Sequence, residues 1–323
     1  MEALAALKPV AGVRSRSSLG VDRYCRRLAR ALQELGVDYT VESTPRSGRA
    51  SHFHLANSSR RSLFQALGAR RYALTVHDVR PRTHALDPLY RGLVYPAVVE
   101  RSTLTIVHSR FAADLLSSIG VRPPRLEIVP HPAPQPASVD RSASRAALRI
   151  SDDRLVAVLP GVIKRAKLVR EAIEAVARLR DDWLIVLAGH VRDRRAAAEA
   201  RAAGAIVVEA PDDPTYENAI VAADAVLCLR LGSVGESNGP LLDALGAARP
   251  LLATETGSIP ETALDAARYV EPTSASIAAG LQALADPAER AERARHAAAR
   301  AAVLTWESSA RAHAKLFAEA FDG

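Results

Sequence analysis

Residues 230–261 read RLGSVGESNGPLLDALGAARPLLATETGSIPE. The stretch opens as a polar, glycine-rich turn that carries Glu236 and Ser237, and it continues as an alanine- and leucine-rich segment that predicts a short helix containing Asp243. Pro240 suits the first helical position, because the N–H group that proline lacks would have no partner there. A carboxylate therefore precedes a helix N-terminus, a place that usually attracts anions such as phosphate.

Outward from this stretch, short apolar runs recur along the chain and predict buried strands. The runs are YALTVHD (72–78), LTIVHS (104–109), LEIVPH (126–131), LVAVLPG (155–161), WLIVLAG (183–189), AIVVEA (205–210), AVLCLR (225–230) and PLLAT (250–254). Helical segments separate most of them, as a parallel sheet with crossover helices requires. The pattern predicts an α/β protein of two doubly wound, Rossmann-like domains that face each other across a cleft.

The two series of strands are separated by residues 130–140, PHPAPQPASVD. This segment is rich in proline and without periodicity, which predicts an interdomain linker. We therefore expect an N-terminal domain over residues 1–135, a C-terminal domain over residues 136–304 and a last helix over residues 305–323.

The composition is that of a globular protein, since 48% of the 323 residues are hydrophobic and 24% are charged. No apolar run reaches the roughly 20 residues that a membrane-spanning helix needs. The first residues, MEALAALKPVAGVRSRSS, lack the basic start and apolar centre of a secretory signal. Cys25 and Cys228 form no C-x-x-C pair, which argues against a disulfide framework or a zinc site. A cytoplasmic location is expected.

Positive charge is concentrated in the first half of the chain. Residues 1–150 contain 23 Lys and Arg against 11 Asp and Glu, and the remainder contains 20 against 25. Arginines at positions 23, 26, 27 and 30 fall on an amphipathic helix predicted over residues 23–35, which Gly36 is expected to end. An anionic partner of the first half would explain this bias, and so would a generic arginine-rich surface.

Common nucleotide and metal motifs are missing from the sequence. No G-x-G-x-x-G opens a helix after a strand and no G-x-x-x-x-G-K-[ST] occurs, which disfavours a dinucleotide-dependent dehydrogenase and a P-loop enzyme. No D-x-D pair occurs, so we expect neither a metal nor a cofactor. Positive charge for an anionic ligand must then come from side chains and helix ends.

The residues GESNG, 235–239, match the G-x-S-x-G nucleophile elbow of serine hydrolases. In that motif the serine directly follows a strand, whereas residues 232–234 stand between the predicted strand and this turn. Asp265 and His296 are the acid and the histidine that remain downstream of Ser237. The hydrolase interpretation is the weaker of two.

The stronger interpretation is a diphosphate with an attached sugar. The N–H groups of Gly239, Leu241 and Leu242 would face the turn and bind the diphosphate. Hydroxyl groups of the sugar would donate to Glu236, and a ribose diol would donate to Asp243. The alternative is that both acids only complement the helix dipole, an effect of about 0.3–1 kcal/mol each. The stretch alone does not decide between the two.

A second loop favours the sugar nucleotide. Residues 161–167, GVIKRAK, follow a predicted strand and precede a helix, and two of the chain's four lysines, Lys164 and Lys167, lie in this loop. Paired cations beside a diphosphate would stabilise the charge that develops as it departs. The alternative is an ordinary solvated loop.

Two positions in the first half are candidates for contact with a ligand. Gly20 precedes the predicted helix, where backbone can approach a ligand closely. His77 lies at the C-terminal end of a strand, the edge at which α/β sheets bind ligands. A lone histidine is more often structural, and Asp78 is the residue that would then anchor it.

Taken in order, several segments resemble the retaining glycosyltransferases of the GT-B fold, of the family-4 type. The segments are GVDRYCRRLARAL (20–32), HFHLANSSRRSL (52–63), LTVHDVRP (74–81), LTIVHSRFAADLL (104–116), IVPHPAP (128–134), GVIKRAK (161–167), LIVLAGH (184–190), residues 229–261 and TWESSA (305–310). Residues 229–261 are the most specific, being similar to a bacterial subgroup whose loop contains Gly-Glu-Thr-Ser-Gly.

The resemblance implies roles for individual residues. Lys164 and Lys167 stand where the family has basic residues on the donor diphosphate. Glu236 and Asp243 correspond to the two acids of the family's E-x7-E motif, the first near the transferred sugar and the second on the donor ribose. The candidates are His77, Lys164, Lys167 and Glu236 for catalysis; Gly161, Lys164, Lys167, Arg230, Glu236, Ser237, Asn238, Gly239 and Asp243 for the donor; and Gly20, Asn57, His77 and Asp78 for the acceptor.

The sequence departs from the family's pattern at three places. The acidic pair is E-x6-D, Leu168 replaces a usual glycine after the lysine, and Ser17 and Ser18 stand where a second glycine is common. These changes bear on the identity of the donor and on the level of activity.

The family implies an enzyme that moves a sugar from a UDP- or GDP-linked donor to a glycan, lipid-linked or small-molecule acceptor, with retention and without an obligatory metal. It also implies that the last helix crosses back to the first domain. We expect no nucleic acid partner, and an anionic acceptor or the inner face of the membrane would fit the basic first half. A catalytically inactive subunit and a sugar-nucleotide epimerase or hydrolase are the competing hypotheses.

Overall fold

A computed structural model describes residues 8–14, 19–56, 60–80, 90–136, 138, 140–180 and 182–321. The chain forms two compact units. Unit 1 comprises Met1–Pro132, Val234–Ser237 and Leu304–Gly323, and unit 2 comprises Ala133–Ser233 and Asn238–Val303. The first division falls inside the proline-rich segment 130–140.

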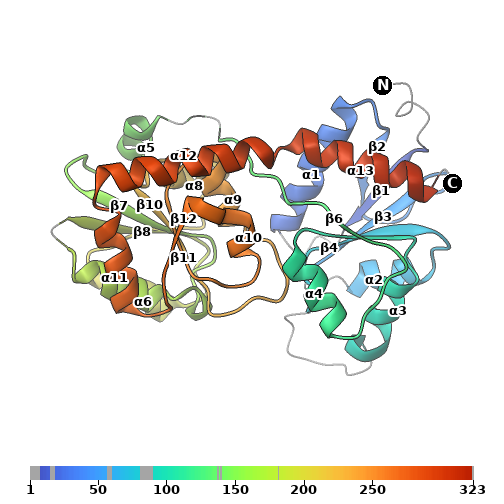
Figure 1. The fold of residues 1–323 in the computed structure, drawn as a ribbon, viewed down its shortest axis with the longest axis horizontal. Coiled ribbons are helices and arrows are strands. Elements are labelled where there is room, and N and C mark those ends of the chain that lie inside the picture. Colours follow the sequence, from blue (N-terminus) through green and yellow to red (C-terminus); the bar gives the residue numbers. More distant parts are fainter. Residues whose placement is uncertain are drawn as a thin grey trace. The chain divides into compact units, whose positions relative to one another are not determined.

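Unit 1 is built on a six-stranded sheet in the order β2-β1-β3-β4-β5-β6. Its strands are β1 (Val10–Arg14), β2 (Tyr39–Glu42), β3 (Ala50–Leu55), β4 (Tyr72–Val76), β5 (Leu104–Val107) and β6 (Leu126–Ile128). All neighbouring strands are parallel. The helices are α1 (Leu19–Glu34), α2 (Arg60–Leu67), α3 (Tyr95–Glu100), α4 (Arg110–Ser118) and α13 (Trp306–Phe321), with a π-helical turn, η2 (Tyr90–Val94), before α3 (Figure 1).

The two faces of this sheet carry different helices. Ala73 of β4 packs in one apolar cluster with residues of α1 and α13, such as Leu28 and Phe317. Leu74 and Val76 belong to a second cluster with residues of α2, α3 and α4. The alternation follows from the two-residue period of a strand, in which successive side chains point to opposite faces. The sheet is therefore covered on both sides.

Unit 2 contains a second six-stranded parallel sheet, in the order β12-β11-β10-β7-β8-β9. Its strands are β7 (Leu155–Pro160), β8 (Trp183–Gly189), β9 (Ile206–Glu209), β10 (Ala225–Cys228), β11 (Leu251–Ala253) and β12 (Ala267–Tyr269). Its helices are α5 (Arg141–Ala147), α6 (Val169–Ala177), α7 (Arg194–Ala202), α8 (Asp213–Ala222), α9 (Gly239–Gly246), α10 (Ile259–Ala263), α11 (Ser274–Ala283) and α12 (Pro287–Val303), with 3-10 turns η3 (Arg165–Lys167) and η4 (Leu264–Ala266).

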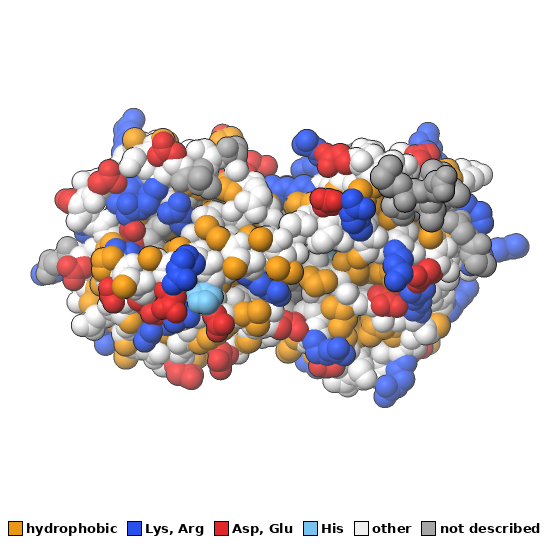
Figure 2. Space-filling model, turned by 45° about the horizontal axis from the view of Figure 1, so that its top comes forward, with side chains coloured by type: hydrophobic (Ala, Val, Ile, Leu, Met, Phe, Trp, Pro, Cys, Tyr) orange, Lys and Arg blue, Asp and Glu red, His pale blue; other side chains and the backbone are white. Residues whose placement is uncertain are grey.

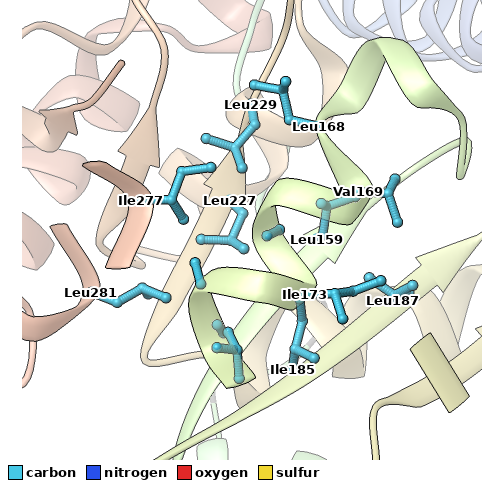
Figure 3. Packing of buried hydrophobic residues seen from close by; sticks show 14 of the residues in the cluster. Leu159, Leu168, Val169, Ile173, Ile185, Leu187, Leu227, Leu229, Ile277 and Leu281 are labelled. Atoms are coloured by element: carbon cyan, nitrogen blue, oxygen red, sulfur yellow. The ribbon is translucent and has the colours of Figure 1, made fainter. Parts of the chain in front are cut away.

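Figure 3 shows one face of the unit 2 sheet and its helices. Leu227 from β10 and Ile185 from β8 lie against Ile173 of α6 and Leu281 of α11, and these residues belong to one buried cluster. Burial of a leucine or isoleucine side chain contributes about 1.5–3 kcal/mol. Apolar runs of this kind allowed β7, β8, β9, β10 and β11 to be predicted from the sequence.

The helix predicted over residues 23–35 starts earlier than expected. It begins at Leu19, so Gly20 lies in its first turn and not before it. Its end is as predicted, because Gly36 has φ 81° and the N–H of Val37 bonds to the carbonyl of Leu32 at 3.0 Å. A glycine in the left-handed conformation commonly closes a helix in this way.

The architecture confirms the predicted α/β class with two doubly wound parallel sheets. Within the described ranges, no helix is both long enough and apolar enough to cross a bilayer. α13 belongs to unit 1 and packs on α1.

Candidate functional site

In unit 2, the loop that follows β7 carries three of the predicted donor residues. Gly161 has φ 88°, a conformation that L side chains rarely adopt, and its N–H bonds to the carbonyl of Ala188 at 2.8 Å. Lys164 is extended, and the single 3-10 turn after it ends at Lys167. Lys167 Nζ donates to the carbonyl of Pro160 at 2.6 Å. The loop thus folds back over the C-terminal end of β7.

Gly161 is surrounded closely enough that no side chain would fit. A Cβ there would lie 2.7 Å from Lys167 Nζ and 3.2 Å from Pro240 Cγ. A Cβ on Gly189 would lie 1.9 Å from the carbonyl oxygen of Gly161. The lysine, the start of α9 and the end of β7 therefore converge on one glycine.

Strand order explains this convergence. β7 lies next to β10, and the sheet continues outward from them in opposite directions, to β8 and to β11. Ligands of α/β proteins bind at such a switch point, beyond the carboxyl ends of the strands. The loops after β7 and β10 are joined there, because the N–H of Leu231 bonds to the carbonyl of Ala166 at 3.1 Å.

The start of α9 differs in detail from the prediction. The helix begins at Gly239, so Pro240 is its second residue. The N–H of Leu242, expected to face the turn, instead donates to the carbonyl of Asn238 at 3.1 Å within the helix. Asn238 precedes the helix without capping it, and its buried Oδ1 has no hydrogen-bond partner among the described residues. That orphaned acceptor points to a missing donor at this position.

The cations of this region affect one another. Burial of the ammonium group, and then the charges of Arg230 and Lys164, lower the pKa of Lys167 to about 7. Arg230 follows β10 and is fixed by its backbone, whose N–H donates to Thr254 Oγ1 at 2.9 Å. An anion placed beside Lys167 would favour its charged form. The arrangement is suited to a ligand that brings negative charge.

Asp243, in the second turn of α9, is half-buried. Tyr216 of α8 donates a hydrogen bond from its hydroxyl to Asp243 Oδ2 at 3.2 Å. Sequence reasoning missed Tyr216, because nothing in the run DPTYENAIVA relates this residue to an acid on another helix.

Glu236 and Ser237 belong to unit 1. Glu236 is buried and its Oε2 accepts the N–H of Val234 at 2.7 Å. The carbonyl of Val234 accepts the N–H of Arg80 at 2.9 Å, and a Cβ on Gly235 would lie 2.5 Å from Val79 Cγ2. The turn GESNG therefore packs on the segment that directly follows His77.

His77 is buried at the C-terminal end of β4. Its Nε2 lies 3.1 Å from His54 Nδ1, and its Nδ1 lies 3.4 Å from His108 Nε2. Burial, followed by the neighbouring histidines, holds the pKa of His77 well below its ordinary value. His54 and His108 lie at both ring nitrogens, so the alternative in which Asp78 anchors the imidazole finds no ring nitrogen to bind.

The other acceptor candidates are less informative. Gly20 is exposed, and a Cβ there would meet nothing within 4 Å, so close packing does not require this glycine. Asn57 lies outside the described residues.

The hydrolase elbow finds no support in the local geometry. β10 ends at Cys228, well before Ser237, so the serine does not directly follow a strand. His296 Nε2 lies 3.7 Å from Glu292 Oε1 on its own helix, and the carbonyl of Asp265 accepts Arg293 at 2.7 Å. Within the described part of the chain, no group of three or more His, Cys, Asp and Glu residues could hold a metal ion.

Solved structures share this architecture at low sequence identity. Sucrose-phosphate synthase from Thermosynechococcus elongatus matches with a TM-score of 0.80 and 16% identity, covering 98% of this chain and 100% of that one. HepE from Anabaena, in complex with UDP and glucose, matches with a TM-score of 0.77 and 13% identity over 97% and 100% of the two chains. The fold is GT-B.

A third GT-B structure, the catalytic domain of starch synthase IV from Arabidopsis thaliana bound to ADP and acarbose, matches with a TM-score of 0.73 and 10% identity over 98% and 100% of the chains. No protein-family model matches the chain, and no curated protein does. At these identities the comparisons show the fold.

The basic bias of the first half is partly balanced by local ion pairs. On α1, Arg26 pairs with Asp22, and Arg30 Nε lies 2.9 Å from Glu34 Oε1. Figure 2 shows basic and acidic side chains interspersed with hydrophobic ones. An anionic acceptor or membrane surface stays a prediction.

Proposed function

We propose that the protein transfers a sugar from a nucleoside-diphosphate sugar to an acceptor, with retention of configuration and without an obligatory metal. The observation that carries this proposal is the convergence of Lys167 and the first turn of α9 on Gly161 in unit 2. A helix N-terminus, a cation and the half-buried backbone of Gly161 are together suited to a diphosphate.

The cations act on the leaving group in this proposal. When the bond between the sugar and the diphosphate breaks, negative charge grows on the diphosphate, and Lys164, Lys167 and Arg230 stabilise it. Because burial lowers the pKa of Lys167 to about 7, this lysine takes up a proton as the diphosphate binds. Two of the fold relatives hold UDP or ADP, which supports a nucleotide at this fold.

The acids bind hydroxyl groups in this proposal. Asp243 takes the ribose diol while Tyr216 orients its carboxylate. Glu236 takes hydroxyls of the transferred sugar, and its backbone bond to Val234 fixes the carboxylate. We assign the acceptor, a glycan, a lipid-linked sugar or a small molecule, to unit 1.

A sugar-nucleotide-binding subunit without transferase activity is the second candidate. Leu168, which stands where the resembled family has glycine, adopts φ 54° and ψ 39° directly after Lys167. This departure from the family's glycine, directly beside a proposed phosphate-binding lysine, is the observation that favours the second candidate. Donor hydrolysis and transfer assays over an acceptor panel separate this candidate from the first.

The donor site is tested by calorimetry with UDP, GDP and ADP in the presence of EDTA. We expect one of them to bind, and Lys167→Ala to weaken it about 10- to 100-fold, since a hydrogen bond to a charged group contributes about 1.5–3 kcal/mol. Lys315→Ala removes an exposed lysine on α13 and should leave the affinity unchanged. Failure of all three nucleotides to bind would remove the basis of the proposal.

The role of Glu236 is tested by comparing two measurements, the affinity for the nucleoside diphosphate and the rate of sugar transfer. Glu236→Gln keeps an oxygen that can accept the N–H of Val234, so we expect wild-type affinity for the nucleoside diphosphate and a loss of transfer of at least tenfold. Ser237→Ala should be mild in both assays. A silent Glu236→Gln with an inactive Ser237→Ala would favour the hydrolase instead.

A further inference from the structure

Unit 1 holds a cluster of histidines that the donor site does not use. Six of the nine histidines in the sequence gather on the face of its sheet that α1 and α13 cover. They are His52, His54, His77, His108, His131 and His313. All are buried except His131, which is half-buried. Buried polar rings need hydrogen-bond partners, and here the rings find them in one another, in tyrosine and threonine hydroxyls and in backbone carbonyls.

Four of these rings form one continuous chain of hydrogen bonds. The steps are Val129 O to His108 Nδ1 (2.9 Å), His108 Nε2 to His77 Nδ1 (3.4 Å), His77 Nε2 to His54 Nδ1 (3.1 Å), His54 Nε2 to Tyr39 OH (3.1 Å), Tyr39 OH to His52 Nδ1 (2.9 Å) and His52 Nε2 to Thr75 Oγ1 (2.8 Å). The chain involves five strands or strand ends of one sheet, those of β2, β3, β4, β5 and β6.

The carbonyl of Val129 fixes the direction of the whole chain. A carbonyl only accepts, so His108 Nδ1 must carry the proton, and in a neutral ring His108 Nε2 must then accept. His77 Nδ1 is therefore the donor to His108, which leaves His77 Nε2 as an acceptor for His54.

The same alternation of donor and acceptor nitrogens continues to the other end of the chain, at Thr75. His54 donates from Nδ1, so its Nε2 accepts the hydroxyl of Tyr39, and the Tyr39 oxygen in turn accepts from Nδ1 of His52. The hydroxyl of Thr75 closes the chain by donating to His52 Nε2. One backbone carbonyl thus determines the position of every proton.

The two remaining rings, His131 and His313, also have Nδ1 next to a backbone carbonyl. His131 Nδ1 faces the carbonyl of Pro132 at 3.0 Å. His313 Nδ1 faces the carbonyl of Ser309 at 2.8 Å, and its Nε2 lies 3.4 Å from the hydroxyl of Tyr24. Burial holds the pKa of all six rings below the ordinary value of histidine, so the rings are neutral. The order of donors and acceptors then puts each proton on Nδ1, whereas free histidine in water prefers the proton on Nε2.

The charged groups around the cluster act against its protonation. Arg14 of β1 disfavours the charged form of His54, and Arg27 of α1 disfavours that of His131. Arg14 is itself paired with Asp22. Tyr24 and Cys25 of α1 face the cluster as neutral groups, because burial raises the pKa of each. Asp78, next to His77, is half-buried.

We propose that this hydrogen-bonded chain is a positioning device for the proposed transfer reaction: His108, fixed by the carbonyl of Val129, places the proton of His77 on Nδ1, and His54, which donates to His77 Nε2, opposes a second proton there. The inference rests on the proposed function, in which positive charge develops on the sugar as the diphosphate departs. A cationic imidazole beside that sugar would oppose this charge, and a neutral one does not. His108 acts through His77, and three residues after His77 the N–H of Arg80 bonds to the carbonyl of Val234, in the turn that holds Glu236.

Two substitutions of His108 separate positioning from packing. In His108→Gln the amide oxygen reaches the place of Nε2 and can still accept from His77. In His108→Asn the shorter amide can still donate to the carbonyl of Val129, but His77 Nδ1 loses its acceptor. Nitrogen-15 NMR of histidine-labelled protein reports the protonated nitrogen of each ring, and it does so without any substrate.

The expected results are specific. In the wild type at pH 7.5, His77 carries its proton on Nδ1. His108→Gln keeps that form and the pH profile of transfer, whereas His108→Asn loses the Nδ1–H signal of His77. The acid limb of the pH profile should not move up, because the lost acceptor stabilised the charged ring of His77 at least as much as the neutral one.

A third variant keeps the proposal testable if His108→Asn does not fold. Tyr39→Phe breaks the chain on the far side of His54, away from the carbonyl that sets its direction, so His77 should keep its proton on Nδ1. The proposal is overturned if His77 is protonated on Nε2 or on both nitrogens in the wild type, or if His108→Asn keeps the wild-type tautomer. Loss of nucleotide binding in the calorimetric test would remove the proposed function while leaving the tautomers as measured.

Discussion

Leu168 is a fully buried residue held in the left-handed backbone region, with φ 54° and ψ 39°. This conformation costs a residue with a Cβ about 1–2 kcal/mol, while loss of a buried leucine side chain costs about 2–5 kcal/mol. We expect Leu168→Gly to lower the free energy of unfolding no more than Leu168→Ala does, because glycine relieves the strain. Urea unfolding of both variants measures the difference.

Leu187 in β8 provides the control, since it is equally buried in an ordinary strand. There the glycine variant should be less stable than the alanine variant by about 0.5–1 kcal/mol. The same order at both positions would show that Leu168 is not strained.

Some residues of the candidate site could be predicted from the sequence, and others could not. Lys167, Asn238 and Asp243 could be proposed because they lie in short local motifs at or before the start of a helix. Tyr216 could not, since its importance depends on a partner from another helix.

At the scale of elements, α5 is held against the unit 2 sheet by a buried ion pair. Arg145 NH2 donates to Asp224 Oδ2 at 2.6 Å, and the same oxygen accepts the N–H of Val156 in β7 at 2.7 Å. Asp224→Ala removes the buried partner of Arg145 and leaves it the exposed carboxylate of Asp152 at 3.4 Å, so we expect the free energy of unfolding to fall by about 3–5 kcal/mol. Thermal or urea unfolding tests this.

An exposed pair serves as the comparison for α5. Arg311 and Glu307 lie 2.7 Å apart on α13, and both are more than half exposed. Glu307→Ala should cost less than about 1 kcal/mol, as surface pairs usually do. Equal effects at the two sites would mean that burial adds nothing to the pair in α5.

Strands with continuous apolar runs could be predicted from the sequence, and strands that mix apolar and polar residues could not. β7, β8 and β10 stand out because both faces are buried. β3 (ASHFHL) was missed because His52 and His54 interrupt the apolar pattern, although their two-residue spacing is that of a strand. β1, β2 and β12 were missed as well. The histidine chain depends on the order of β3, β4 and β5 in the sheet, which no local pattern contains.

For the whole molecule, the histidine cluster predicts that unit 1 is sensitive to acid. Burial lowers the pKa of His108 and His313 to about 4 and that of His131 to about 3. The unfolded chain therefore binds more protons below the ordinary pKa of about 6.5, and stability falls as the pH drops from there toward 4. At pH 5 each of these histidines costs about 2 kcal/mol, or about 6 kcal/mol for the three.

This loss is large beside the roughly 5–15 kcal/mol of an ordinary domain. Hydrogen exchange followed by mass spectrometry, corrected for the pH dependence of the intrinsic rates, should show peptides of unit 1 losing protection between pH 7.5 and 5, while those of β7, β8 and β10 keep it. Loss of protection in both units together, or in neither, would contradict the prediction.

The chain's two tryptophans happen to be divided between the units. Trp183 is fully buried in β8, whereas Trp306 opens α13 with its ring centroid 5.5 Å from that of Tyr24 and 6.1 Å from that of His131. Each unit thus carries its own fluorophore. Because a protonated imidazole quenches indole emission, protonation of His131 would lower the fluorescence of Trp306. The Trp183→Phe variant would then report on unit 1 through Trp306, and the Trp306→Phe variant on unit 2 through Trp183.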